Sequence, residues 1–103
     1  MSEQRERRIG ENEAYWRQVN ELSPPAPGMM NLMFCECGRL ECRDRVPMTA
    51  EEYHEVRARS TTFLVVPGHA LPEAEIVIET RDRFEVVEKR GEAARVAVET
   101  DPT

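Results

Sequence analysis

Apolar residues recur at helical spacing between residues 11 and 22. Those that share one face are Tyr15, Val19 and Leu22, with Trp16 beside them. This pattern predicts an amphipathic helix, which should end near residue 22 because three prolines follow in segment 23–28. The prolines favour an extended tether, so we expect the helix to pack on the rest of the domain or, alternatively, on a partner protein.

Four short apolar runs predict β-strands. The first, at residues 29–34, is rich in methionine and leads directly into Cys35. The other three are rich in β-branched or aromatic residues and comprise 62–66, 76–78 and 84–87. The last two runs predict a hairpin through residues 80–83, whose register stays open because this turn lacks glycine. We assign the methionines to the core, with an adaptable binding surface as the alternative.

A second helix is predicted in the middle of the chain. Thr49 can cap its first turn while the Glu52 side chain reaches back to the Thr49 backbone, as in a capping box. Glu55 and Arg59 are spaced to pair on its surface. Because capping, pairing and the helix dipole explain the carboxylates of this helix, including that of Glu51, we interpret them as structural and not as catalytic.

The length and composition suit one small α+β domain. Of the 103 residues, 40% are apolar and 33% are charged, which leaves too little core for two domains. We expect three parts: an amphipathic helix and Pro-rich tether at 1–28, an α+β core at 29–90, and a weakly structured tail at 91–103. In the core, the capped helix should cross a short antiparallel or mixed sheet. The tail has the residues of a frayed helix, an edge strand or a disordered end.

Charge and hydropathy bear on the class of partner. The net charge of −6 and the pI near 5.0 oppose contact with phosphate backbones and anionic lipids. A protein partner is therefore expected, and nucleic acid or a membrane is not. Arg5, Arg7 and Arg8 are interleaved with glutamates, which predicts a solvated arm and not a binding patch. The sequence shows no long uncharged apolar run and no secretory signal, so a cytoplasmic location is expected.

Three cysteines, Cys35, Cys37 and Cys42, lie within eight residues, and the chain has no others. Their charged neighbours indicate a polar loop. We predict that the thiolates bind zinc, which would stabilise a core of about sixty residues, close to the size at which domains need such support. Buried free thiols and redox chemistry are the alternatives, although Cys-x-Cys is not the usual spacing of a redox pair. Gly38 should let the loop curl under the metal.

A tetrahedral zinc site needs a fourth ligand. His69 is preferred because it follows a predicted strand and a Pro-Gly turn. His54 competes with it, but its place beside charged residues in the capped helix predicts an exposed side chain. Other groups that would complete the shell are water or a carboxylate from Glu36, Glu41 or Asp44. A water ligand would make the site a possible catalytic one.

One combination of motifs resembles a protein family. The residues that carry the likeness are Phe34-Cys35-Glu36-Cys37-Gly38, Cys42, Met48-Thr49, Glu52-Tyr53, Val56-Arg57, Phe63, Val65, Pro67-Gly68-His69, Pro72-Glu73 and Val86-Val87-Glu88-Lys89. Together they resemble a family of short, uncharacterised actinobacterial proteins, and the likeness covers most of the chain. That family has the cysteines and the Pro-Gly-His motif and usually has Glu in place of His54. The resemblance implies a ligand set of Cys35, Cys37, Cys42 and His69.

These features predict a small intracellular zinc-binding protein in which the zinc is structural. We expect it to act as a protein-interaction or regulatory module, and we favour this role over that of an enzyme. Two other classes stay open at this point: a zinc-dependent enzyme with an open metal position, and a zinc module that binds nucleic acid.

Overall fold

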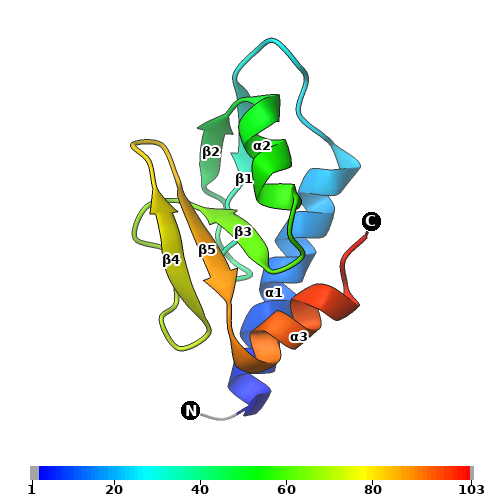
Figure 1. Ribbon diagram of the computed structural model, residues 1–103, viewed down its shortest axis with the longest axis vertical. Helices are drawn as coiled ribbons and strands as arrows, with labels where there is room; N and C mark the ends of the chain where they lie inside the picture. Colours follow the sequence, from blue (N-terminus) through cyan, green and yellow to red (C-terminus); the bar gives the residue numbers. More distant parts are fainter. Residues whose placement is uncertain (1–2, 103) are drawn as a thin grey trace.

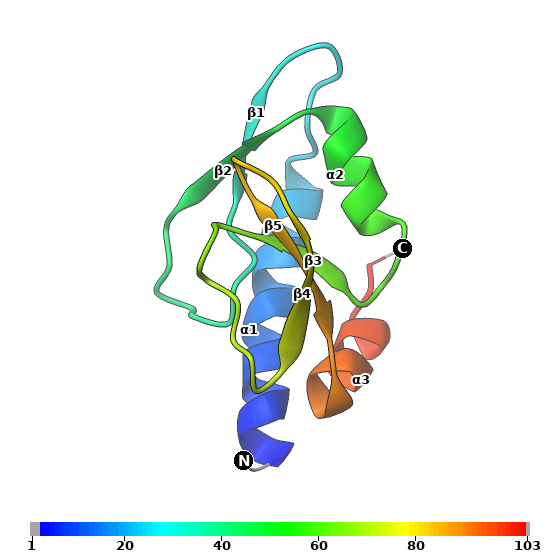
Figure 2. The same cartoon turned by 60° about the vertical axis from the view of Figure 1, so that its left-hand side comes forward.

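The computed structural model describes residues 3–102, in which helix α1 (Glu3–Leu22) runs beside both sheets (Figure 1, Figure 2). The elements that follow are β1 (Asn31–Phe34), β2 (Arg45–Met48), α2 (Ala50–Arg57), β3 (Thr62–Val65), β4 (Glu75–Thr80), β5 (Glu85–Lys89) and α3 (Gly91–Glu99). Strands β1 and β2 form one antiparallel sheet, and β3, β5 and β4 form a second in that order. Three helices and two small sheets in residues 3–102 confirm the predicted α+β class.

Helix α1 begins earlier than predicted and buries a different face. Its end at Leu22 is as predicted, but the helix already starts at Glu3. Tyr15 and Leu22, predicted to face the core, are 53% and 76% exposed. The side chains buried instead are Ile9, Glu13, Trp16, Arg17 and Asn20. Three of these are polar, so a search for apolar periodicity could not find this face.

The buried polar residues of α1 all have partners. Asn20 exchanges two hydrogen bonds with the backbone of Phe34, at 2.9 and 3.0 Å, and so joins the helix to β1. Arg17 donates to the carbonyl oxygens of Ser60 and Ala97 at 2.7 and 2.8 Å. Its guanidinium also lies 4.7 Å from the centre of the Phe63 ring. Pairing of this kind removes most of the cost of burying polar groups.

A charged triad is buried between α1 and the three-stranded sheet. The Lys89 ammonium contacts the carboxylates of Glu13 and Glu75, and all three side chains are fully buried. Burial raises the pKa of Glu13 well above its usual range. Burial also acts to raise the pKa of Glu75, but the hydrogen bond from Glu13 and the charge of Lys89 outweigh it and lower that pKa overall. One ammonium therefore lies between two carboxyl groups whose pKa values are displaced in opposite directions, that of Glu13 upwards and that of Glu75 downwards.

The segment predicted as a weak tail is largely helix α3. Its buried residues are Ala93, Val96 and Ala97. These small side chains allow a close helix contact, because a Cβ atom at Gly10 of α1 would lie only 3.0 Å from the Ala93 Cα atom. Arg7 reinforces the contact through Glu99, at 3.0 Å. The basic residues Arg5, Arg7 and Arg8 are exposed to solvent, as expected, but they lie in a packed helix and not in an arm. The predicted boundaries at residues 28 and 90 stay predictions.

The two-stranded sheet was only half predicted. β1 confirms the expected strand, whereas β2 was missed because Pro47 interrupts its pattern. Proline is compatible with this sheet because each of its two strands is an edge. The assignment of the methionines to the core is right for Met33, which is buried, and wrong for Met29 and Met30, which are exposed.

Helix α2 has the predicted capping box. The Glu52 backbone N–H donates to Thr49 Oγ1 at 3.1 Å, and the Thr49 N–H donates to Glu52 Oε1 at 2.8 Å. The predicted pairing of Glu55 with Arg59 is wrong, because Arg59 pairs with Glu88 instead. Glu88 lies on β5, so this ion pair joins the turn that follows α2 to the larger sheet. It is not a pair between two residues of the helix.

Strand β5 is the central strand of the larger sheet, between β3 and β4. All four residues of β3 are buried, and Phe63 faces Val87 in the antiparallel register. β4 and β5 form the predicted hairpin, with an irregularity between Val77 and Glu79 that sequence did not indicate. Among the described helices, none has the length and apolar character needed to cross a bilayer.

Candidate metal centre

Three cysteines and one histidine converge at one point of the fold. One ligand atom from each of Cys35, Cys37, Cys42 and His69 lies within 4.8 Å of the other three. Cys35 and Cys37 are buried, and Cys42 and His69 are partly exposed. These are the four residues that the sequence singled out, brought together across a separation of 34 positions between Cys35 and His69.

The two sheets position the cluster from opposite sides. Cys35 directly follows β1, and its N–H donates to the Asp44 carbonyl oxygen at 3.0 Å. The next N–H, that of Glu36, donates to the carbonyl oxygen of Leu64 in β3 at 2.8 Å. His69 follows β3 through a turn in which its N–H donates to the Val66 carbonyl oxygen at 2.9 Å. The cluster therefore lies where the ends of β1 and β3 meet.

Two distances between ligand atoms fit one tetrahedral metal ion. His69 Nδ1 lies 3.5 Å from Cys35 Sγ and 3.8 Å from Cys42 Sγ. A sulfur and an imidazole nitrogen bound to the same tetrahedral zinc would be separated by about 3.6 Å, given Zn–S of about 2.3 Å and Zn–N of about 2.0–2.1 Å. The four side chains therefore need little movement to bind one ion.

The surroundings of the ligand atoms also suit a metal. His69 turns Nδ1 towards the sulfurs, and its other nitrogen, Nε2, lies 3.6 Å from Asp44 Oδ2. A carboxylate on the far side of the ring is a common way of orienting a histidine ligand. The Val66 N–H donates to Cys35 Sγ at 3.2 Å, which stabilises negative charge on that sulfur. Asp44 is thus placed as a partner of His69 and not as a ligand.

The thiols differ in acidity because they lie side by side. Hydrogen bonding from the Cys35 thiol lowers the pKa of Cys37 to about 5. The same contact, followed by burial, raises the pKa of Cys35. Burial is the main cause that raises the pKa of Cys42. Metal binding requires thiolates, so a cation that binds the three sulfurs would release their protons.

Helix α1 holds the cysteine loop from outside. Asn12 Nδ2 donates to the Gly38 carbonyl oxygen at 2.9 Å, and Trp16 Nε1 donates to that of Arg39 at 3.3 Å. Gly38 is needed for space and not for a special backbone angle. A Cβ atom there would lie 2.7 Å from Ile9 Cγ2. Gly68, in the turn before His69, is a glycine near the cluster that does have a positive φ angle, of 90°.

The competing ligands lie elsewhere. His54 is exposed on α2 and belongs to no described group that could hold a metal. Glu36 is buried between the two cysteines, but its carboxylate accepts from Arg57 at 2.6 Å and from Asn20 at 2.8 Å. Adjacent side chains here point to opposite sides of the backbone, so both cysteines of Cys-x-Cys face the cluster and the residue between them faces away. That alternation was the available signal for the role of Glu36.

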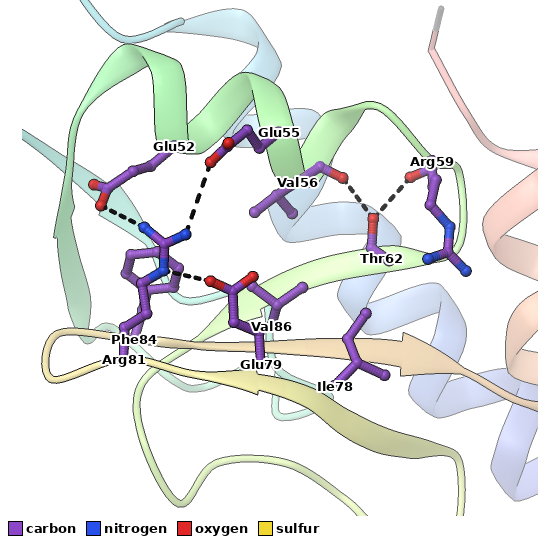
Figure 3. A pocket seen from close by; sticks show the side chains of 10 residues that line it. All are labelled: Glu52, Glu55, Val56, Arg59, Thr62, Ile78, Glu79, Arg81, Phe84 and Val86. Atoms are coloured by element: carbon purple, nitrogen blue, oxygen red, sulfur yellow. Dashed lines mark hydrogen bonds and ion pairs between the residues drawn. The ribbon is translucent and has the colours of Figure 1, made fainter.

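The carboxylates of α2 line a hollow that has no link to the metal cluster. This hollow, of about 240 Å³, lies between α2 and the β4–β5 hairpin (Figure 3). Arg81 is at its edge and pairs with Glu52 at 2.9 Å, with Glu55 at 3.9 Å and with Glu79. Figure 3 shows Glu52, Glu55 and Glu79 directed at this one guanidinium. The pairing agrees with the structural interpretation of these carboxylates.

Comparison of the chain with known protein families, with curated protein sequences and with solved structures finds no match.

Proposed function

We propose that the protein binds one structural zinc ion through Cys35, Cys37, Cys42 and His69 and acts in the cytoplasm as a protein-interaction or regulatory module. The observation that carries the proposal is the convergence of these four ligand atoms within 4.8 Å of one another. The resemblance of the motifs to a family of short actinobacterial proteins is part of the same proposal.

The chemistry of the donors supports zinc over other common ions. Three thiolates and an imidazole form a soft to borderline ligand set, whereas calcium and magnesium prefer oxygen atoms. Four protein donors also complete a tetrahedral shell, which is the usual state of a structural zinc site. A catalytic zinc would keep one position for water, and Glu36, a potential base, is instead paired with Arg57.

The position of the cluster supports a structural role. A zinc ion there would join the end of β1, the cysteine loop and the turn after β3. These segments come from both sheets, so the ion would hold together parts that are far apart in sequence. The loop would then form a fixed surface next to α1, which suits a module that presents side chains to a partner.

The choice between the two histidines can be tested with cobalt as a spectroscopic substitute for zinc. Cobalt bound tetrahedrally by thiolates absorbs strongly in the visible range, and its bands shift when a ligand changes. We expect His69→Ala to weaken cobalt binding by roughly a hundredfold and to alter the bands, because one of four ligands is lost. His54→Ala should leave affinity and spectrum unchanged, because His54 is exposed on α2.

The two variants are matched, since each removes one imidazole from the same chain. Equal cobalt affinity and identical spectra for His69→Ala and wild type would contradict the proposed ligand set. A spectrum altered by His54→Ala alone would assign the fourth position to His54.

A further inference from the structure

Positive charge without a carboxylate partner is concentrated around the cysteine loop. Most exposed arginines pair with glutamates, and these are Arg5, Arg7, Arg59, Arg81, Arg83 and Arg95. In residues 3–102, the exposed arginines without a carboxylate in pairing distance are Arg8, Arg39, Arg43, Arg45 and Arg90. Arg90 stands apart at the start of α3, whereas the other four lie on α1, on the cysteine loop or at the start of β2. We call these four the arginine band.

Two members of the arginine band stack on aromatic rings. The Arg45 guanidinium lies 3.9 Å from the centre of the Phe34 ring, and Phe34 stacks on Trp16 at 5.2 Å. Arg43 lies 5.3 Å from the centre of the Trp16 ring. Stacking restricts a guanidinium while leaving its edge available for hydrogen bonds, so less entropy is lost when it binds a carboxylate.

The remaining donors of these arginines are largely free for a partner. Arg43 donates through Nη1 to the carbonyl oxygens of Leu40 and Cys42, and Arg45 donates through Nη1 to that of Leu32 at 3.4 Å. Each guanidinium has five N–H donors in a planar fork that matches a carboxylate. Both side chains can therefore bind a carboxylate without breaking an ion pair in the protein.

The band continues into a hollow between α1 and the cysteine loop. This cavity of about 220 Å³ is lined by Arg8 and Arg39, with the apolar side chains of Leu40 and Leu71 and one carboxylate, Glu41. It adjoins the aromatic stack, because the backbone of Arg39 accepts the hydrogen bond from Trp16 Nε1.

Exposed apolar side chains flank the arginines. Leu32 is 62% exposed and Leu40 is 46% exposed. A surface that combines unpaired arginines, the partly exposed ring of Phe34 and exposed leucines resembles the centre of a protein interface more than a site for a phosphate backbone. The overall charge of −6 also disfavours nucleic acid, since the rest of the surface would repel it.

We propose that the arginine band, with Phe34, Leu32 and Leu40, binds an acidic peptide segment of a partner protein that carries apolar side chains between its carboxylates. Carboxylates of the segment pair with Arg43 and Arg45, and an apolar side chain packs on Leu32 or enters the hollow beside Leu40. This inference rests on the proposed function, because it gives the interaction module a surface and a class of partner.

The single tryptophan of the chain makes the proposal directly measurable. The metal-loaded protein is titrated at low salt with a capped peptide of alternating glutamate and leucine, and Trp16 emission is recorded. We expect a saturable change in emission with this peptide and none with its lysine–leucine counterpart. Oligothymidylate serves as the nucleic-acid probe and is expected not to bind.

Two double variants with the same change in net charge locate the site. Arg43→Glu with Arg45→Glu should weaken binding of the glutamate–leucine peptide by about tenfold or more, as loss and reversal of two charge pairs require. Arg90→Glu with Arg95→Glu should leave affinity within about twofold of wild type. Arg8→Glu should also weaken binding. Because Arg8 lies on α1 and not in the cysteine loop, this result would show that the weakening does not come from damage to the loop.

The outcomes separate this proposal from the metal site. Zinc content is measured in each sample, so wild type that holds zinc but does not bind the glutamate–leucine peptide overturns the peptide proposal alone. Equal weakening by both double variants, or binding of oligothymidylate in place of the peptide, overturns it as well. Absence of zinc from wild type contradicts the proposed function whatever the peptide does.

Discussion

Replacing Cys37 by Ser is expected to release the metal and unfold the protein. Cys37 is fully buried, and its sulfur belongs to a cluster whose four ligand atoms lie within 4.8 Å of one another. A structural zinc contributes on the order of 10 kcal/mol in small domains, which is comparable to the whole stability of about 5–15 kcal/mol of an ordinary protein. Loss of this buried sulfur should therefore release the ion and, with it, most of the stability of the metal-loaded protein.

Circular dichroism and metal content measured on the same sample test this expectation. Cys37→Ser should show lost tertiary signal and less than one metal per chain, and a strong chelator should have a similar effect on wild type. Met30→Ser is the matched control, because it replaces an exposed sulfur outside the cluster. A Cys37→Ser protein that melts like wild type would show that the cluster does not support the fold.

Replacing Lys89 by Met is expected to destabilise the protein by about 3–5 kcal/mol. Lys89 is the one ammonium between the buried carboxyl groups of Glu13 and Glu75, so its loss leaves buried negative charge uncompensated. Urea unfolding of the metal-loaded proteins measures the change. Arg90→Met provides the control, since it removes a neighbouring positive charge from an exposed position. Equal stability of Lys89→Met and wild type would show that the Lys89 ammonium does not compensate buried negative charge in the triad.

The two carboxyl groups of the triad should respond differently to removal of charge. Burial raises the pKa of Glu13 well above its usual range, so we expect this carboxyl group to be neutral in the folded protein and Glu13→Gln to cost little. Glu75 has a lowered pKa and is the partner of the ammonium, so Glu75→Gln should cost more. A larger loss of stability in Glu13→Gln than in Glu75→Gln would reverse this assignment.

The raised pKa of Glu13 also predicts a dependence of stability on pH. Above the usual glutamate pKa of about 4.5, the unfolded chain releases this proton while the folded protein retains it. Stability from Glu13 is therefore complete below that pH and declines as the pH rises towards the folded pKa. Glu13→Gln should lack this decline, so the difference in unfolding free energy between it and wild type should change across that window. A difference that is constant with pH would contradict a retained proton.

Local signals in the sequence were sufficient for several elements and for the members of the cysteine–histidine cluster. The capping box of Thr49 and Glu52 involves neighbouring residues, so its pattern identifies α2 directly. The β-branched runs identify β3 and the β4–β5 hairpin for the same reason. The cysteines share one loop, and the Pro-Gly turn before His69 marked the one distant member of the cluster.

Features that depend on tertiary pairing could not be predicted in this way. Helix α1 buries Glu13, Arg17 and Asn20, each of which is stable inside only because of a partner elsewhere in the chain. Strand β2 contains Pro47, which breaks its strand pattern. Helix α3 buries mainly small side chains, which pack because Gly10 of α1 lets the two helices approach closely. Glu36, placed between Cys35 and Cys37 in sequence, points away from the cluster to Arg57.

Native mass spectrometry with elemental analysis, on wild type expressed without added metal, tests the central claim most directly. One zinc ion per folded chain, absent from Cys37→Ser, is the predicted result. A folded wild-type protein that carries no metal would contradict the zinc site and leave three clustered thiols whose chemistry would have to be explained without it.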